Sequence, residues 1–517
     1  MKNKLLVMGI LAFVATLLLG LGPAGAVWLN KEKTIEMKGK LQTRVSVSTE
    51  DTTGFTYPQV DAWEVVQHRN IAYVEFNHQL KNHDWSGVNL QYHLLGRFMY
   101  EGIYDYGPEE YRNLPDIIPA ETDIDDFRKD ADLWEGYVDI SKNKLFLRIG
   151  RQNLAWGETD LFRILDNINP LDNTYGGIFE DLDDRRIPLD MLRANYDFGN
   201  VGPIYSFTLE GYWVPGFIED TVAPWPPQGT RYSFPLPLTS DLLGPTFTNY
   251  GYELVEPEKK MEDSRFGIRH TGILFDNINY TLAFMRTIPD VPIPRFTADF
   301  ASVTPGVPPF ASMNRELIYD TLDIFGASVN FYESFTDLVF RMEAAFFDDE
   351  PVFIPSENAA PIAFLLGGPF ATERSVPKRD IVRYMVGLDK FQWIRFLNPN
   401  STFFISLQYF GQYMKDHSDD IAVAVPLPPA GATYPKVKEI EHTFTGLISS
   451  PYRQGALEPQ LSVVYDVRGT WMFQPQVNFK FDPFRLMLQY STISGERTSF
   501  GHFKDRDQLT TILTYVF

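Results

Sequence analysis

Alternation of apolar and polar residues recurs along most of this 517-residue chain, and it strongly limits the folds that the chain can adopt. Residues 145–152 are a clear case, because Leu145, Leu147 and Ile149 share one face of the predicted strand while Arg148 lies on the other. Such segments run for roughly nine to thirteen residues, the length that a tilted strand needs to cross a bilayer core. The pattern therefore predicts an all-β transmembrane antiparallel barrel.

About eighteen segments share this alternation. They are 41–47, 72–79, 88–97, 134–140, 145–152, 189–198, 204–213, 265–271, 278–286, 324–331, 338–347, 382–391, 402–412, 442–449, 457–467, 471–481, 486–494 and 508–517. An even number of strands is what a bacterial single-chain barrel requires. The connection at 466–469 is very short for the side on which it falls, so a barrel of sixteen strands is the alternative.

The connections between these segments are of two kinds. Short turns at 141–144, 198–200, 275–277 and 481–483 alternate with connections of roughly 20 to 50 residues. Outer-membrane barrels have short periplasmic turns and long extracellular loops, whereas a soluble sandwich does not sort its loops in this way. We therefore expect long loops on the extracellular side.

Both ends of the chain suggest export to the outer membrane. Lys2 and Lys4 precede an apolar run, and Ala24-Gly25-Ala26 forms a small-residue cleavage site, so we predict a Sec signal peptide at 1–26 and a barrel at 27–517. The final segment ends on Phe517 and is similar to the signal read by the barrel-assembly machinery; an ordinary edge strand is the alternative. The expected location is the cell outer membrane, in contact with its lipid and lipopolysaccharide.

Composition excludes several classes of function. The net charge of −21 lacks the basic surface that nucleic-acid binding needs. The absence of cysteine excludes disulfides and thiolate metal sites. The histidines form no HExxH motif and no GxSxG elbow occurs, so we expect neither an enzyme nor a cofactor.

The polar faces of the strands would line the barrel interior, and they are rich in arginine. The predicted luminal residues are Arg97, Arg148, Arg151, Arg265, Arg269, Arg341, Arg383 and Glu343. Rings of charged side chains set selectivity in pores, so these residues could form an anion-attracting constriction. Alternatively, they pair with each other or with an infolded loop and hold the barrel in shape.

The segment after the strand at 145–152 changes its period. Behind Trp156, an apolar set falls at helical spacing and Asn169-Pro170 ends the run, which predicts a short amphipathic helix. The apolar set is Leu161, Ile164, Leu165 and Ile168. We expect the loop at 153–188, which also includes Asp172, to fold inward as a constriction, with the helix against an apolar surface.

Other long connections carry two further chemistries. Acidic runs at 123–132, 180–184 and 348–350 predict acidic rims, for which binding of a divalent cation is the alternative to a solvated surface. The run at 123–132 lacks the glycine and the closing glutamate of an EF-hand loop, which favours the solvated surface. Proline-rich apolar stretches occur at 221–247, 289–313, 351–370 and 421–435. Apolar loops are unfavourable in water, so these stretches either cap the mouth or form a vestibule for an apolar or amphiphilic solute.

Three short motifs follow one another around this loop: Gly150-Arg151-Gln152, Trp156-Gly157 and Asn169-Pro170-Leu171-Asp172. Behind a barrel strand they resemble the uncharacterised Gram-negative outer-membrane family DUF1302, and more distantly the alginate-export porins. The resemblance implies a barrel that moves lipids or other hydrophobic molecules, sometimes alongside an efflux pump and a periplasmic lipid-handling partner. It transfers no catalytic residues.

The predicted function is an outer-membrane conduit for hydrophobic or amphiphilic, lipid-like solutes, with 153–188 as its constriction. One alternative is a general porin for small hydrophilic solutes. The other is a plugged structural or adhesive barrel whose loops serve a partner.

Overall fold

The computed structural model describes residues 27–52, 60–80, 87–112, 124–218, 222–224, 231, 253–299, 312–358, 376–423, 435–496 and 499–517. The predicted signal peptide lies outside these residues, as does most of the predicted proline-rich stretches. Within the described ranges, no helix is long and apolar enough to cross a membrane.

Eighteen antiparallel strands form one closed barrel, which confirms the predicted fold and excludes sixteen strands. They are β2 (Ile35–Ser48), β3 (Val65–Gln79), β4 (Asn89–Glu101), β5 (Lys129–Lys142), β6 (Leu145–Gln152), β7 (Leu189–Val201), β8 (Ile204–Val214), β10 (Arg265–Leu274), β11 (Ile278–Thr287), β14 (Leu322–Glu333), β15 (Leu338–Pro351), β16 (Lys378–Gln392), β17 (Phe403–Met414), β18 (Ile440–Ser449), β19 (Leu457–Asp466), β20 (Thr470–Phe481), β21 (Phe484–Gly495) and β22 (Gln508–Val516). Each pairs with its neighbours, and β22 pairs with β2 to close the ring. Closure leaves the barrel without a free edge strand.

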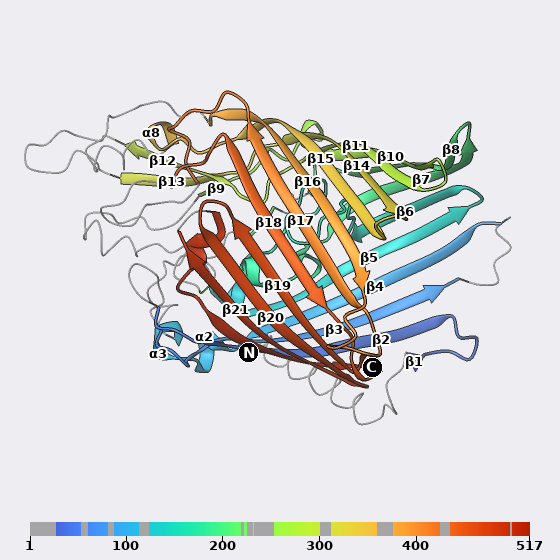
Figure 1. Cartoon of the computed structure of the whole chain (residues 1–517). Coiled ribbons are helices and arrows are strands. Elements are labelled where there is room, and N and C mark those ends of the chain that lie inside the picture. The colour runs from blue at the N-terminus through green and yellow to red at the C-terminus, as the bar shows by residue number, and fades with distance from the viewer. Residues whose placement is uncertain are drawn as a thin grey trace, which may run out of the picture.

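The short connection that raised doubt about the strand count is a tight turn on the side of the long loops. It joins β19 to β20, whose register runs from Asp466↔Thr470 to Leu457↔Phe479. Figure 1 shows the described parts of the long connections at one end of the barrel, on the left, and short turns such as that between β7 and β8 at the other. We call these the long-loop end and the short-turn end.

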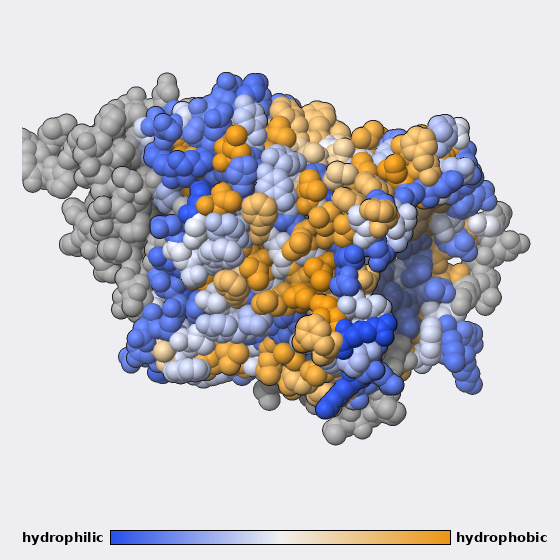
Figure 2. Space-filling view, in the orientation of Figure 1, coloured by the Kyte–Doolittle hydropathy of each residue, from blue (hydrophilic) through white to orange (hydrophobic). Residues whose placement is uncertain are grey.

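The two faces of the wall differ as the alternation predicts. Large apolar side chains such as Ile268, Leu282 and Leu407 are about half exposed on the outer face, whereas Met285 and Ile324 face inward and are fully buried. Figure 2 shows apolar residues spread in a broad band across the wall, with hydrophilic residues toward both ends. The outer face therefore matches a hydrocarbon environment.

Smaller elements are present that are not part of the barrel ring. A short strand, β1 (Val27–Trp28), pairs with β2. The long connections contribute β9 (Glu253–Val255), β12 (Ile293–Asp299) and β13 (Ser312–Ile318), which form a separate three-stranded sheet at the long-loop end. The sequence analysis missed these strands, because their proline-rich neighbourhood reads as loop. The short α-helices are α2 (Ile103–Tyr106), α3 (Glu109–Arg112), α5 (Ile124–Arg128), α6 (Leu182–Arg185) and α8 (Pro355–Asn358).

Candidate functional site: the loop inside the barrel

The connection between β6 and β7, residues 153–188, lies against the inner face of the barrel. Its residues bond to inward-facing side chains of β2, β3, β8, β11, β14, β15 and β17. Its apolar residues also pack on the inner faces of β19, β20 and β21. Because these strands lie on all sides of the barrel, the loop spans the lumen from one wall to the other.

A hydrogen-bonded base fixes the loop where it leaves and rejoins the wall. The side chain of Asn169 accepts from the backbone N–H of Leu154 at 2.9 Å and donates to the carbonyl of Ile187 at 2.7 Å. The backbone N–H of Asp172 donates to the carbonyl of Arg185 at 2.7 Å. Asn169 is fully buried, so the bonds of its side chain are protected from water. Two lobes emerge from this base: lobe A, residues 155–168, and lobe B, residues 173–184.

The three motifs of the sequence coincide with this base. Gly150 adopts a φ of +128°, and a Cβ there would collide with the backbone of β5. The buried Gln152 side chain donates to the carbonyls of Gly150 and Met191, each at 3.1 Å. Asp172 accepts the backbone N–H of Thr174 at 2.9 Å, which begins lobe B. The motifs therefore shape the turn from wall to loop.

The helix predicted at 161–168 is wrong. Residues 153–170 contain bends and no helix, and the short helical elements of the loop are a 3-10 turn at Gly177–Phe179 and α6. Glu343 of β15 accepts the backbone N–H of Glu158 at 2.6 Å and that of Leu165 at 2.7 Å. A carboxylate of the wall thus accepts hydrogen bonds from backbone N–H groups that a helix would pair within itself. Tertiary contacts therefore decide the backbone conformation here, although the apolar side chains have helical spacing.

Polar anchors fasten lobe A to the wall. The indole N–H of Trp156 donates to Glu210 of β8 at 2.7 Å, and both side chains are buried. Asp160 accepts from Arg341 of β15 at 2.8 Å and from Gln408 of β17 at 2.7 Å. The anchors are spread over strands on different sides of the lobe, and they hold it across this half of the lumen.

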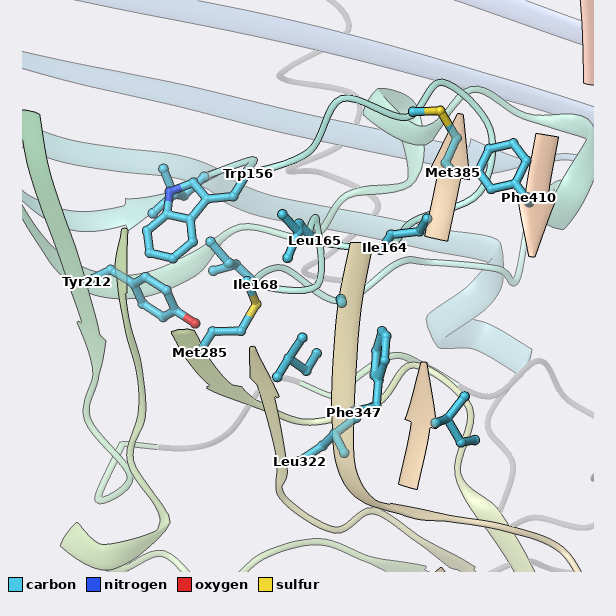
Figure 3. Close-up of a cluster of buried hydrophobic side chains, with 14 of the residues drawn as sticks. Trp156, Ile164, Leu165, Ile168, Tyr212, Met285, Leu322, Phe347, Met385 and Phe410 are labelled. Carbon is cyan, nitrogen blue, oxygen red and sulfur yellow. The ribbon is translucent and has the colours of Figure 1, made fainter. Parts of the chain in front are cut away.

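Lobe A covers an apolar area of the inner wall, which we call the apolar wall. Its main side chains are Tyr212, Met285, Leu322, Ile324, Ala345, Phe347, Ile381, Met385, Phe410 and Met414, from β8 to β17. Ile164, Leu165 and Ile168 of the lobe are buried in the same cluster, with Trp156 edge-on to Tyr212 at 5.2 Å between ring centroids. Figure 3 shows these loop residues between the surrounding strands.

Polarity changes with depth along the inner face. On β15, Phe347 and Ala345 lie nearer the long-loop end, and Glu343 and Arg341 lie deeper. The same change occurs on β8 between Tyr212 and the buried Glu210. The interior therefore has an apolar layer at the long-loop end and a charged layer below it, and lobe A crosses at the boundary.

Lobe B is fastened to the opposite wall by a buried charge cluster. Glu180 contacts Arg44 of β2 and Arg69 of β3, and all three side chains are less than a tenth exposed. Burial by itself raises the pKa of Glu180, but the two guanidinium groups outweigh it and hold the pKa below its ordinary value. Phe179 packs on Val464, Met472 and Ile493. The expectation of a solvated acidic rim is therefore wrong for Glu180, because the arginines of the wall draw it inside.

Most of the predicted luminal arginines face carboxylates. Arg148 donates to Asp139 through two bonds of 2.7 and 2.9 Å, and Arg269 lies 2.9 Å from Glu210. Arg341 lies between Asp160 of the loop and Asp389 of β16, 2.7 Å from the latter. Arg97 contacts Asp130, Arg151 lies 3.1 Å from Asp132, Arg383 lies 2.8 Å from Glu350, and Arg265 is buried at the start of β10. These positions match the pairing alternative of the sequence analysis.

The sequence analysis missed several residues that hold the loop. Glu210 carried a detectable signal, since it alternates within β8 on the same face as Tyr212. Asp160 carried none, because no periodicity extends across a loop. Asn169 was named in the sequence analysis, but as part of a motif and as the end of a predicted helix rather than as an anchor. As for metals, no group of three or more His, Asp or Glu residues suited to one occurs in the described ranges. The site is a set of structural ion pairs around an apolar contact.

Comparison of the sequence with known families gives one match over nearly the whole chain. The profile described as Protein of unknown function (DUF1302) matches residues 7–517. The chain belongs to the DUF1302 family. This confirms the resemblance carried by the three motifs, which in this DUF1302 protein form the base of the infolded loop. No curated protein matches the chain.

Solved structures similar to this DUF1302 barrel include three proteins from Gram-negative bacteria. Acinetobacter baumannii OccAB1 is 11% identical, with a TM-score of 0.47 over 96% of this chain and 99% of that chain. Pseudomonas aeruginosa OccK9 (OpdG) is 8% identical, with a TM-score of 0.46 over 93% and 97%. Pseudomonas aeruginosa OpdK with vanillate is 10% identical, with a TM-score of 0.44 over 93% and 98%. At this level of likeness they carry no argument about the solute.

The substitution Asn169→Ala tests the loop base of the DUF1302 protein. It leaves the N–H of Leu154 and the carbonyl of Ile187 without their partner, at a cost of about 1–3 kcal/mol per buried group. We expect faster hydrogen exchange throughout 154–188 and unchanged exchange in the barrel strands. Asp184→Ala, at an exposed position in the same loop, is the control. Equal exchange in the two variants would contradict the role of the base.

Proposed function

We propose that this protein is an outer-membrane transport barrel for hydrophobic or amphiphilic solutes, with loop 153–188 as its constriction. The carrying observation is the apolar wall on the inner face, from Tyr212 to Met414. A water-filled pore for small hydrophilic solutes needs a polar lining. An apolar inner face beside an infolded loop instead suits a solute with an apolar part.

The charged layer supports the same conclusion. Its arginines are matched by carboxylates, as in the chain of contacts Asp160–Arg341–Asp389. Charges that are neutralised at contact distance exert little net attraction on a passing anion. We therefore assign the luminal arginines to holding the loop and the wall, and we place solute selection at the apolar wall.

The proposal includes the partners of the barrel and its route of export. The band of apolar side chains on the outer wall suits outer-membrane lipid and lipopolysaccharide. The predicted Sec signal peptide and the terminal β22 suit export and recognition by the barrel-assembly machinery. A periplasmic or efflux partner would deliver or accept the solute at the short-turn end.

The test makes the apolar wall polar without shortening its side chains. In Met285→Gln with Met385→Gln, two fully buried thioethers become amides of similar length. An amide in an apolar site is unfavourable by at least about 1–3 kcal/mol, so entry of an apolar probe should slow about tenfold or more. The measurement is uptake of N-phenyl-1-naphthylamine by cells that carry each variant.

The matched control is Met342→Gln on β15. Met342 neighbours the inward-facing Glu343 and therefore points to lipid, so probe uptake should equal that of the wild type. Equal uptake in all three proteins would contradict the hydrophobic conduit. A wide, ohmic and weakly selective conductance in planar bilayers would then favour the general porin, and no conductance would favour a plugged barrel.

A further inference from the structure

A row of small residues crosses three adjacent strands inside the apolar wall. The register pairs Ala283 of β11 with Gly326 of β14, and Gly326 with Ala345 of β15. All three face inward, because they alternate with lipid-facing residues such as Leu282 and Phe325. Larger side chains surround them, so the row is a shallow notch in the wall, which we call the small-residue notch.

Leu165 of lobe A fills this notch. Its side chain is 1% exposed. A Cβ built on Gly326 would lie 3.1 Å from Leu165 Cγ and would collide with Leu165 Cδ2. The absence of a side chain at Gly326 is therefore what allows Leu165 to sit against the sheet. Glu343 bonds the backbone N–H of the same residue, so apolar and polar contacts meet at Leu165.

The fastening of lobe A differs from that of the base. The base is held by bonds of the chain to itself, through Asn169 and the segment near Arg185. Lobe A is held to the wall chiefly by Glu210, Glu343 and Arg341. Its own links to the base are Arg163, which donates to the carbonyl of Asn169 at 2.6 Å, and Asp166, which contacts Arg186, so these two would move with the base. Lobe A can therefore leave the wall while the base stays intact, as loops that close active sites move about fixed ends.

We propose that the Leu165 contact is an autoinhibitory latch, and that its exit from the small-residue notch is the step that opens the barrel. Lobe A then swings away from the wall about the base. This inference rests on the proposed function, because the apolar wall that lobe A uncovers is the surface that a hydrophobic solute contacts. Since lobe A covers that wall in the closed state, solute contact and closure exclude each other.

A reversible cross-link tests the latch directly. The chain has no cysteine, so Leu165→Cys with Gly326→Cys carries only the introduced pair. The spacing between the Gly326 Cβ position and Leu165 Cγ suits a disulfide. We measure single-channel conductance in planar bilayers before and after a reductant. The oxidised protein should remain closed, and reduction should restore openings at least about tenfold more frequent.

A second variant removes the dependence on the cross-link. Ala345→Leu fills the notch from the β15 side and should displace Leu165, which raises the frequency of openings. Ala344→Leu is the matched control, because Ala344 lies on the lipid-facing side of the same strand. The control should behave like the wild type, and it also reports any effect of the added volume on folding.

The outcomes separate the latch from the proposed function. Equal openings in the oxidised and reduced double cysteine protein, or in Ala345→Leu and Ala344→Leu, would overturn the latch. Uptake of N-phenyl-1-naphthylamine that still depends on Met285 and Met385 would leave the proposed function standing. Absence of conductance in every variant, together with uptake that does not depend on those methionines, would overturn both.

Discussion

Replacing lobe A, residues 155–168, by a short Gly-Ser linker is expected to produce a large and steady conductance. In the structure, this lobe crosses the lumen and covers the inner face of the wall from β8 to β17. Its removal takes away the contacts of Trp156, Asp160 and Leu165 together. Because a segment that occludes a pore controls its conductance, we expect an increase of about tenfold or more in planar bilayers.

A folding check and a comparison with lobe B serve as controls for this variant. The linker retains Leu154 and Asn169, so the hydrogen-bonded base stays available and the barrel should keep its heat-dependent migration on gels. A linker in place of residues 173–184 serves as the comparison, since lobe B covers the opposite wall. Unchanged conductance after removal of both lobes would favour the plugged structural barrel over a conduit.

The second large effect is expected from Glu180→Gln in lobe B. The carboxylate of Glu180 faces the guanidinium groups of Arg44 and Arg69, and no water reaches the cluster easily because all three side chains are buried. Removal of one partner from a buried ion pair costs about 3–5 kcal/mol, because the remaining charges stay uncompensated. Hydrogen exchange at 173–184 should accelerate by about a hundredfold or more.

The pH dependence of the same cluster has a defined sign. The pKa of Glu180 in the folded protein lies below its ordinary value of 4.5, since the two arginines outweigh burial. The stabilisation is therefore fully present above about pH 4.5 and is lost as the pH falls through the folded value. Protection factors at 173–184, corrected for intrinsic exchange, should fall with acid in the wild type and stay flat in Glu180→Gln.

Asp183→Asn provides the matched control for this prediction. Asp183 belongs to the same lobe and contacts Arg186, but its side chain is 89% exposed. Exposed ion pairs contribute little, so exchange in this variant should match the wild type. A loss of protection as large as that of Glu180→Gln would show that any charge change loosens lobe B, and that the buried cluster has no special role.

The strands were predictable because their signal is local. Each strand that crosses a membrane between lipid and an interior must alternate, whatever its partners are, so β6 and its neighbours could be recognised singly. The motif from Gly150 to Asp172 also indicated the family and the departure of the chain from the wall. Its physical role needed the structure, because Asn169 acts on residues on both sides of the loop.

The helix at 161–168 shows where local pattern fails. The apolar spacing of Leu161, Ile164, Leu165 and Ile168 is real, and the last three are buried. A helix would satisfy its own N–H groups, but the carboxylate of Glu343 and the notch at Gly326 select an irregular path instead. The spacing of apolar residues in the sequence predicts which side chains become buried, but it does not predict which surface they are buried against.

The sequence by itself determined that this is a barrel of about eighteen strands, which faces of its wall meet lipid, and where the chain leaves the wall at Gln152. These features follow from alternation and turn chemistry within a few residues. Only the tertiary structure decided that Arg341 and Glu180 are neutralised, and that Leu165 lies against Gly326. Those contacts join residues more than a hundred positions apart, which closure of the ring brings together.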